Sequence, residues 1–298
     1  MNKSPRLVAL ETLYSIFYDG SYSNIALDKA LSDIKENKAF ISALVYGVTE
    51  KKITLDYFID KYAQGRIKPK VRIVLWLGAY QLLFMDKVPS SASINESVKL
   101  VKEIKQDYYS KLVNAVLHKI DNDRQIPYDL SVKYSVPENL INMWKKQYGE
   151  DVLNEFLPCI NDKPPLFAIP NKKFVNSDEL LYELECDGIL GEAYDEFVLI
   201  ENANDLTASK AFKNGLFYIE DLSSFNCANA LDALSDDLVL DMCSAPGGKA
   251  FTISQSMNNS GKIYCYDLHE HRLNLIKSSA KRLSIDNIYT DVNDATVY

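Results

Sequence analysis

The sequence contains no apolar stretch long enough to cross a membrane. Its longest apolar run, Ile73–Met85, spans 13 residues and includes Gln81, whereas a membrane-spanning helix needs about 20 apolar residues. The first residues show no long apolar run before a small-residue cleavage site, so we expect no secretory signal. The expectation is a cytoplasmic protein that does not contact a membrane.

Paired cysteines are lacking as well. The chain has five cysteines, an odd number, and they lie far apart: Cys159, Cys186, Cys227, Cys243 and Cys265. None belongs to a C-x-x-C pair of the kind that binds zinc or performs redox chemistry. We therefore expect free thiols and no bound metal.

Basic residues are too few to outweigh the acidic ones over the whole chain. The sequence carries 33 Lys and Arg against 41 Asp and Glu, a net charge of -8. The distribution is uneven, because residues 1–126 hold 19 basic and 14 acidic residues, while residues 127–298 hold 14 and 27. The positive excess of the first part favours RNA as a partner there, although an ordinary scatter of surface charge explains it equally well.

The first 120 residues show helical periodicity throughout. Apolar side chains recur at helical spacing, as at Leu7, Leu10, Leu13, Tyr14 and Phe17. No alternating strand pattern competes with this spacing, so an all-α bundle is predicted for residues 1–126. Within it, Ser93 and Glu96 predict a capping box, in which each side chain bonds a backbone amide at the start of a helix.

The remainder of the chain mixes strands and helices. Residues 127–214 combine short apolar runs with turn residues, which predicts a small α+β middle domain. From residue 238 strands and helices alternate, with strands predicted at 238–241, 262–267 and 287–290. This order is typical of βαβ units. The predicted fold is therefore multidomain and ends with the first half of an α/β Rossmann-like domain at residues 215–298.

One loop carries the pattern of a nucleotide-binding site. The run DMCSAPGGK, residues 241–249, joins the first of these strands to a helix, which is where open α/β sheets bind nucleotides. Gly247 and Gly248 permit close backbone approach, and the helix amides point at a bound anion. Asp267 ends the second strand and can accept both hydroxyls of a ribose. Asp294 follows the third strand, where it or its neighbouring backbone can contact an adenine amine.

Other interpretations of the loop explain less. A plain structural turn does not account for acids at the ends of two successive strands. The G-x-G-x-x-G of dinucleotide dehydrogenases is absent, and Lys249 is followed by Ala250 rather than by the Ser or Thr of a P-loop. Cys243 near a helix start invites a role as nucleophile, but without a neighbouring base a backbone or packing role is favoured. Cys265, inside a predicted strand, is expected in the core.

Several segments resemble the ribosomal RNA small subunit methyltransferase B family, the Sun-type enzymes that form 5-methylcytosine in 16S ribosomal RNA. DMCSAPGGK resembles the first cofactor motif of that family, YDLHEHRL (residues 266–273) its second and NDA (residues 293–295) its third. FYIEDLSS resembles the segment that leads into the methyltransferase domain. The helical part resembles the antitermination factor NusB through LWLGAYQLLFMDKVP and KLVNAVLHKI. The resemblance spans nearly all of the chain.

The resemblance implies an S-adenosylmethionine-dependent RNA methyltransferase whose partner is 16S ribosomal RNA. It implies that the following residues contact S-adenosylmethionine: Cys243, Ser244, Ala245, Pro246, Gly247, Gly248, Lys249, Asp267 and Asp294. The sequence departs from the family at Ile169 and His118, where arginine is common. RNA contacts at those two positions are therefore not carried over.

The catalytic residues are unknown from the sequence. Members of the family add a cysteine to carbon 6 of cytosine, because carbon 5 is a poor nucleophile until a thiolate has added. No residue of the sequence matches that cysteine, so it is expected beyond Tyr298, and the chain is expected to be a fragment that is inactive alone. Such a fragment is expected to leave Leu238, Val239 and Leu240 on an unpaired, apolar strand edge. The main alternative is a non-enzymatic RNA-binding adapter that acts through the NusB-like domain, and a further one is a methyltransferase that acts on another RNA or on protein.

Overall fold

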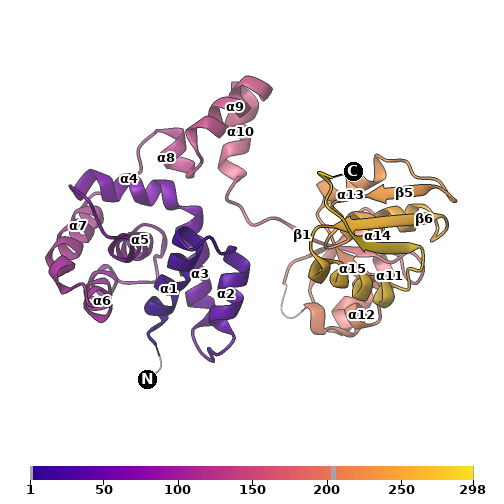
Figure 1. Ribbon diagram of the computed structural model, residues 1–298, viewed down its shortest axis with the longest axis horizontal. Coiled ribbons are helices and arrows are strands. Elements are labelled where there is room, and N and C mark those ends of the chain that lie inside the picture. Colours follow the sequence, from indigo (N-terminus) through magenta and orange to yellow (C-terminus); the bar gives the residue numbers. More distant parts are fainter. Residues whose placement is uncertain (1–2, 203–205, 298) are drawn as a thin grey trace. The chain divides into compact units, whose positions relative to one another are not determined.

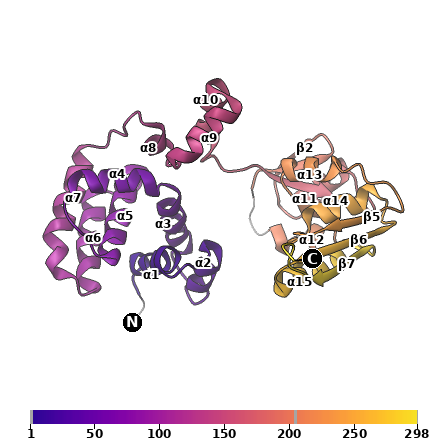
Figure 2. The same ribbon diagram turned by 45° about the horizontal axis from the view of Figure 1, so that its top comes forward.

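The computed structural model describes residues 3–202 and 206–297; the nucleophilic cysteine, expected beyond Tyr298, lies outside them. The chain divides into two compact units, Met1–Asp162 and Lys163–Tyr298, and each is described by itself (Figures 1 and 2). The three-part division that the sequence suggests stays a prediction. No helix in the described ranges is long and apolar enough to span a membrane.

The described residues of the first unit form helices and the loops between them, with no strand among them. Its elements follow one another with short connections: α1 (Pro5–Tyr18), α2 (Ser23–Leu31), α3 (Lys38–Glu50), α4 (Lys52–Tyr62), α5 (Pro69–Phe84), α6 (Ser90–Glu103), the 3-10 helix η1 (Asp107–Tyr109), α7 (Ser110–Asn122), α8 (Leu130–Tyr134), α9 (Glu138–Tyr148) and α10 (Glu150–Cys159). The predicted helical character of the N-terminal region is confirmed.

Helix α5 lies at the centre of this unit. Ten of its 16 residues are buried, among them Trp76, and α1, α3, α4, α6 and α7 all pack against it, as Figures 1 and 2 show. Pro69 occupies the first helical position, where its missing amide hydrogen costs nothing. Gln81 is buried but satisfied, because its amide donates to the Leu77 carbonyl at 2.6 Å and its oxygen accepts from Arg6 at 2.7 Å. A helix that is apolar all round is expected to be central.

The predicted capping box is wrong. Helix α6 begins at Ser90, after Pro89, so Ser93 lies inside the helix. The Ser93 hydroxyl donates to the Gly78 carbonyl of α5 at 3.0 Å, and the Glu96 carboxylate accepts from Lys99 instead of a backbone amide. Pro89 sets the helix start because its fixed φ suits the position before the first turn.

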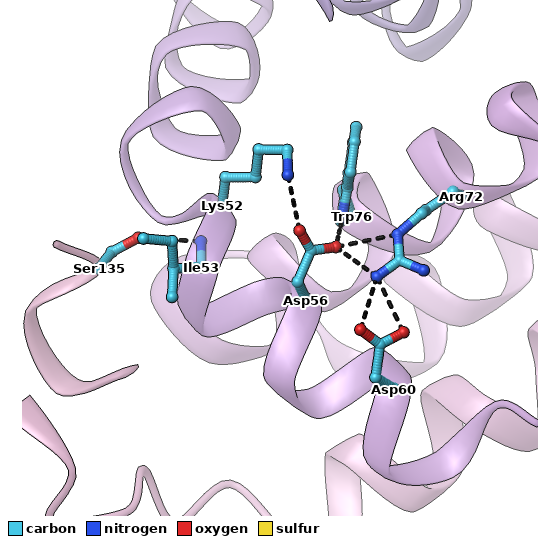
Figure 3. Close-up of polar contacts among 7 residues, drawn as sticks. All are labelled: Lys52, Ile53, Asp56, Asp60, Arg72, Trp76 and Ser135. Carbon is cyan, nitrogen blue, oxygen red and sulfur yellow. Dashed lines mark hydrogen bonds and ion pairs between the residues drawn. The ribbon is translucent and has the colours of Figure 1, made fainter. Parts of the chain in front are cut away.

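A polar cluster joins α4 to α5 (Figure 3). The Asp56 carboxylate accepts hydrogen bonds from the Lys52 ammonium at 2.7 Å, the Trp76 indole at 2.7 Å and the Arg72 guanidinium at 2.6 Å. Arg72 also bonds both oxygens of Asp60 at 2.9 Å. Burial works against ionisation of Asp56, yet its three donors outweigh that effect and hold its pKa below the ordinary value.

Helix α8 is tied to the same region. The Ile53 amide donates to the Ser135 hydroxyl at 3.1 Å (Figure 3), and the Thr54 hydroxyl donates to the Val132 carbonyl at 2.5 Å. These bonds fix the segment 130–135 against α4.

The second unit contains two sheets. Its elements are β1 (Leu166–Pro170), α11 (Ser177–Cys186), β2 (Gly191–Tyr194), β3 (Phe197–Ile200), the 3-10 helix η2 (Leu206–Ala208), α12 (Lys210–Lys213), β4 (Phe217–Ile219), α13 (Leu222–Asn229), β5 (Leu238–Asp241), α14 (Gly248–Ser256), β6 (Lys262–Asp267), α15 (Glu270–Leu283) and β7 (Ile288–Val292). Strands β2, β3, β1 and β4 pair antiparallel in that order, and β5, β6 and β7 pair parallel.

The two sheets share one apolar core. Phe167 and Tyr218 of the antiparallel sheet belong to the same buried cluster as Phe251 of α14 and Ile276 of α15. Asn171 adds a polar tie, because its buried side-chain amide donates to the carbonyls of Gly215 and Leu283. The common core fixes β4 beside α14, which matters for the site.

Strand β5 forms one edge of the parallel sheet. Its apolar side chains Leu238 and Leu240 are 74% and 54% exposed. Among the described residues all three apolar side chains thus lie on an edge strand, as expected from the sequence, but Val239 is half-buried because it packs against the core of this unit.

Candidate functional site

The loop of residues 242–247 turns sharply between β5 and α14. Gly247 is the N-cap of α14 and has φ 110°, a conformation that side-chain-bearing residues rarely adopt. A Cβ on Gly247 would lie 2.7 Å from the ring of Phe251, and one on Gly248 would lie 2.8 Å from Glu220 Oε1. Close packing and the positive φ therefore favour glycine at 247, and a side chain at 248 would displace the Glu220 carboxylate. The amides of the first turn of α14 are left facing the loop.

The loop crosses the carboxyl end of β6. Both the amide and the hydroxyl of Ser244 donate to the Tyr266 carbonyl at 2.9 Å. One residue on, Asp267 is only 4% exposed; its Oδ1 accepts from the His269 amide at 3.1 Å. Arg272 links the two segments, because its guanidinium donates to the Ala245 carbonyl at 3.0 Å and lies 3.3 Å from Asp267 Oδ2.

The segment after β7 reaches the same edge of the sheet. The Asn293 amide donates to the Asp267 carbonyl at 3.2 Å. The Asp294 carboxylate accepts from both the amide and the hydroxyl of Thr296, and these bonds lower its pKa. The structure thus brings the glycine loop, Asp267 and the segment of Asp294 to one end of three neighbouring parallel strands, which is where α/β sheets bind ligands.

A pocket of about 420 Å³ opens beside the loop. Of the nine residues that the sequence singles out, six line it: Cys243, Ser244, Ala245, Pro246, Gly248 and Lys249. Gly247, Asp267 and Asp294 are not part of its wall. Pro164, Leu166 and Ile219 also line the pocket. The pocket therefore follows one flank of the loop, whereas Asp267 lies at the neighbouring strand end.

Sequence reasoning missed Glu220 in the wall of this pocket. Glu220 follows β4 and is 7% exposed. Its Oε2 accepts from the Thr252 hydroxyl at 2.6 Å, which also lies 2.8 Å from the Tyr218 hydroxyl. Burial raises the pKa of Glu220, against the opposing effects of the Thr252 bond and of Lys249. An acid directly after an apolar strand, in FYIED, was the available signal.

Further charges surround the pocket. Burial raises the pKa of Asp241, although its Oδ1 accepts from the Cys243 amide at 3.3 Å. Asp221 caps α13 through the Ser224 amide, and bonds from Ser224 lower its pKa. The Lys249 ammonium donates to the Ser224 hydroxyl at 3.0 Å. Three carboxyl groups and one ammonium thus line the pocket, an arrangement suited to a ligand that carries positive charge together with a carboxylate.

The two cysteines near the loop differ in environment. Cys265 is fully buried in β6, and burial raises the pKa of its thiol to about 12, so it is an inert core residue as expected. Cys243 is exposed in the loop.

Two family models match the chain. Residues 3–122 match the NusB family, and residues 228–298 match the 16S rRNA methyltransferase RsmB/F family. The probable ribosomal RNA small subunit methyltransferase B of Bacillus subtilis (strain 168) is 32% identical over 98% of this chain and 69% of its own length. The ribosomal RNA small subunit methyltransferase B of Escherichia coli O127:H6 (strain E2348/69 / EPEC) is 27% identical over 94% of this chain and 67% of its own length.

A solved structure shares the fold. The crystal structure of PH0851 matches 99% of this chain and 70% of that chain with a TM-score of 0.74, at 24% sequence identity. At this sequence identity the similarity shows the fold alone.

Proposed function

The chain belongs to the ribosomal RNA small subunit methyltransferase B family, and we propose that it serves S-adenosylmethionine-dependent formation of 5-methylcytosine in 16S ribosomal RNA. The observation that carries this proposal is the glycine loop lying across the end of β6, next to the buried Asp267. A non-enzymatic adapter is not favoured, because the family match extends to the methyltransferase part, residues 228–298.

The residues present fit the methyl donor. Gly247 and Gly248 leave no room for a Cβ and let the backbone approach a ligand. Asp267 supplies a buried carboxylate for the two ribose hydroxyls, and we assign the adenine amine to Asp294 or its neighbouring backbone. When bound, the donor supplies a methyl group on a positively charged sulfur. Ribose hydroxyls would share Asp267 with Arg272, whose side chain is 44% exposed.

The rest of the donor contacts are assigned to the pocket beside the loop. We propose that Cys243, Ser244, Ala245 and Pro246 contact it mainly through their backbone, and that Lys249 pairs with the carboxylate of its methionine part. Glu220, with Oε2 already bonded to Thr252, and Asp241 hold negative charge on the same pocket wall. They favour the ammonium and the sulfonium over neutral ligands.

Titration calorimetry with S-adenosylmethionine tests this assignment. Asp267→Ala removes a charged acceptor, and bonds to charged groups contribute about 1.5–3 kcal/mol, so affinity is expected to fall about 10- to 100-fold. Asp286→Ala, an exposed acid in the turn before β7, is the matched control and is expected to bind as the unaltered chain does. Equal affinity of the Asp267→Ala variant and the control would remove the basis of the proposal.

A further inference from the structure

A groove of about 580 Å³ lies in the first unit, outside the methyltransferase part. It is formed by α4, by the segment between α7 and α8, and by α8 itself. We name it the tyrosine–lysine groove after five of the residues that line it: Tyr57, Tyr128, Tyr134, Lys61 and Lys133. The other lining residues are Asp123, Gln125, Ile126 and Pro127. Its volume falls in the range of roughly 300–1,000 Å³ that is usual for ligand pockets. Three aromatic rings and two ammonium groups in one groove favour a ligand that has flat rings and negative charge.

The rings and ammonium groups of the groove are interleaved. The Lys133 ammonium lies 5.6 Å from the ring centroid of Tyr128 and 4.9 Å from that of Tyr134, and the Lys61 ammonium lies 5.9 Å from that of Tyr57. Tyr128 is 88% exposed. A tyrosine ring left this open presents its face to a stacking partner.

Positive charge exceeds negative charge in the groove. Asp123 is paired with Lys61 at 2.6 Å and also accepts from the Tyr62 hydroxyl. Lys133 forms no ion pair with any residue between 3 and 202 or between 206 and 297. The ammonium group of Lys133 is therefore available for an anionic ligand, next to the exposed ring of Tyr128.

The floor of the groove is held in place before any ligand arrives. Two bonds tie α8 to α4: one from the Ile53 amide, which Figure 3 shows, and one from the Thr54 hydroxyl. They fix the helix that carries Lys133 and Tyr134. Asp129 caps α8 by accepting from the Val132 amide at 2.9 Å. A platform that is already ordered loses little conformational entropy on binding.

We infer that the tyrosine–lysine groove binds an unpaired nucleotide of RNA, with a base stacked on Tyr128 and a phosphate paired with Lys133. An unpaired base has a free π-face for a tyrosine ring, whereas a base inside a duplex does not. This inference rests on the proposed RNA substrate and names a contact site for it that is separate from the methyl-donor loop.

The test is fluorescence anisotropy of a short labelled oligouridylate with the full chain. Tyr128→Ala is expected to weaken binding about 5- to 100-fold, the range that one base–aromatic stack provides, and Tyr128→Phe is expected to restore it. Lys133→Ala is expected to lower the steepness of the salt dependence by about 0.7, the value for one phosphate contact on a single strand. Tyr108→Ala is the matched control, because Tyr108 is 92% exposed but lies in η1, outside the groove.

The outcomes are distinct. Loss of affinity in Tyr128→Ala with unchanged binding in Tyr108→Ala supports the site. Equal affinity of the two alanine variants overturns it, as does loss with Lys133→Ala alone, which would mark a surface that attracts any anion. Calorimetry with S-adenosylmethionine on the same variants keeps the proposals apart: the groove variants are expected to bind the methyl donor normally, whatever the result for Asp267→Ala.

Discussion

Among the acidic residues of the first unit, Asp56 is the one whose replacement we expect to lower the free energy of unfolding most. Asp56→Asn keeps the side-chain volume but removes the charge that faces Lys52 and Arg72. Removing one partner from a buried ion pair costs about 3–5 kcal/mol. The Asp56 and Arg72 side chains are 23% and 25% exposed, so solvent screening reduces the loss, and we expect about 2–3 kcal/mol.

Urea unfolding followed by tryptophan fluorescence measures this loss. Both tryptophans of the sequence, Trp76 and Trp144, lie in the first unit, so the signal reports on that unit alone. With a slope of about 1–3 kcal/mol per molar urea, the midpoint is expected to fall by about 1 M. Asp60→Asn is the control, because Asp60 also bonds Arg72 but its side chain is 61% exposed, and it should cost less than about 1 kcal/mol.

The same substitution has a pH signature. The pKa of Asp56 is lowered in the folded state, so its contribution to stability is complete above the unfolded pKa of about 3.9 and is lost as the pH falls through the folded value. The difference between the unaltered chain and Asp56→Asn is therefore expected to be full at neutral pH and to shrink in acid. A difference that stays constant down to the acid limit, or one matched by Asp60→Asn, would refute the reasoning.

Two further predictions concern the pocket beside the glycine loop. Gly248→Ala places a Cβ 2.8 Å from Glu220 Oε1, so either the Glu220 carboxylate or the first turn of α14 must shift, and both belong to the proposed site. Calorimetry is expected to show at least a tenfold loss of S-adenosylmethionine affinity; unchanged affinity would mean that the site tolerates the shift. Glu220→Gln mimics the protonated acid. Because burial raises the pKa of Glu220, the affinity of the unaltered chain for S-adenosylmethionine is expected to fall as the pH drops through that raised pKa. The Glu220→Gln variant is expected to lose this pH dependence. At neutral pH its affinity is expected to be about tenfold lower.

The strands of the parallel sheet could be predicted closely from the sequence. The predicted strands 238–241 and 262–267 match β5 and β6 residue for residue, and 287–290 differs from β7 by one or two residues. Short apolar runs bounded by turn residues are a local signal, and the glycine loop depends on neighbours in sequence. Local chemistry was therefore sufficient to locate the loop and the strand that it crosses.

Features that depend on distant contacts were missed. Helix α8 has only five residues and is held by bonds to α4, a helix about 80 residues earlier, so no periodicity marks it. The capping box failed because Ser93 has a better partner in the Gly78 carbonyl, on a different helix. Glu220 becomes a pocket residue only when the shared core sets β4 beside α14, which no local pattern predicts.

The acidic lining of the pocket bears on the choice of ligand. Glu220, Asp221 and Asp241 oppose the single ammonium of Lys249, so a phosphate-rich ligand such as a dinucleotide would meet repulsion there. The sulfonium and the ammonium of S-adenosylmethionine are attracted by these carboxylates instead. The product left after methyl transfer has a neutral sulfur and is attracted less. The same charges disfavour the RNA backbone at this point. The groove with Lys61 and Lys133, in a region with more basic than acidic residues, is the better place for phosphates, so the two binding sites that we propose differ in charge.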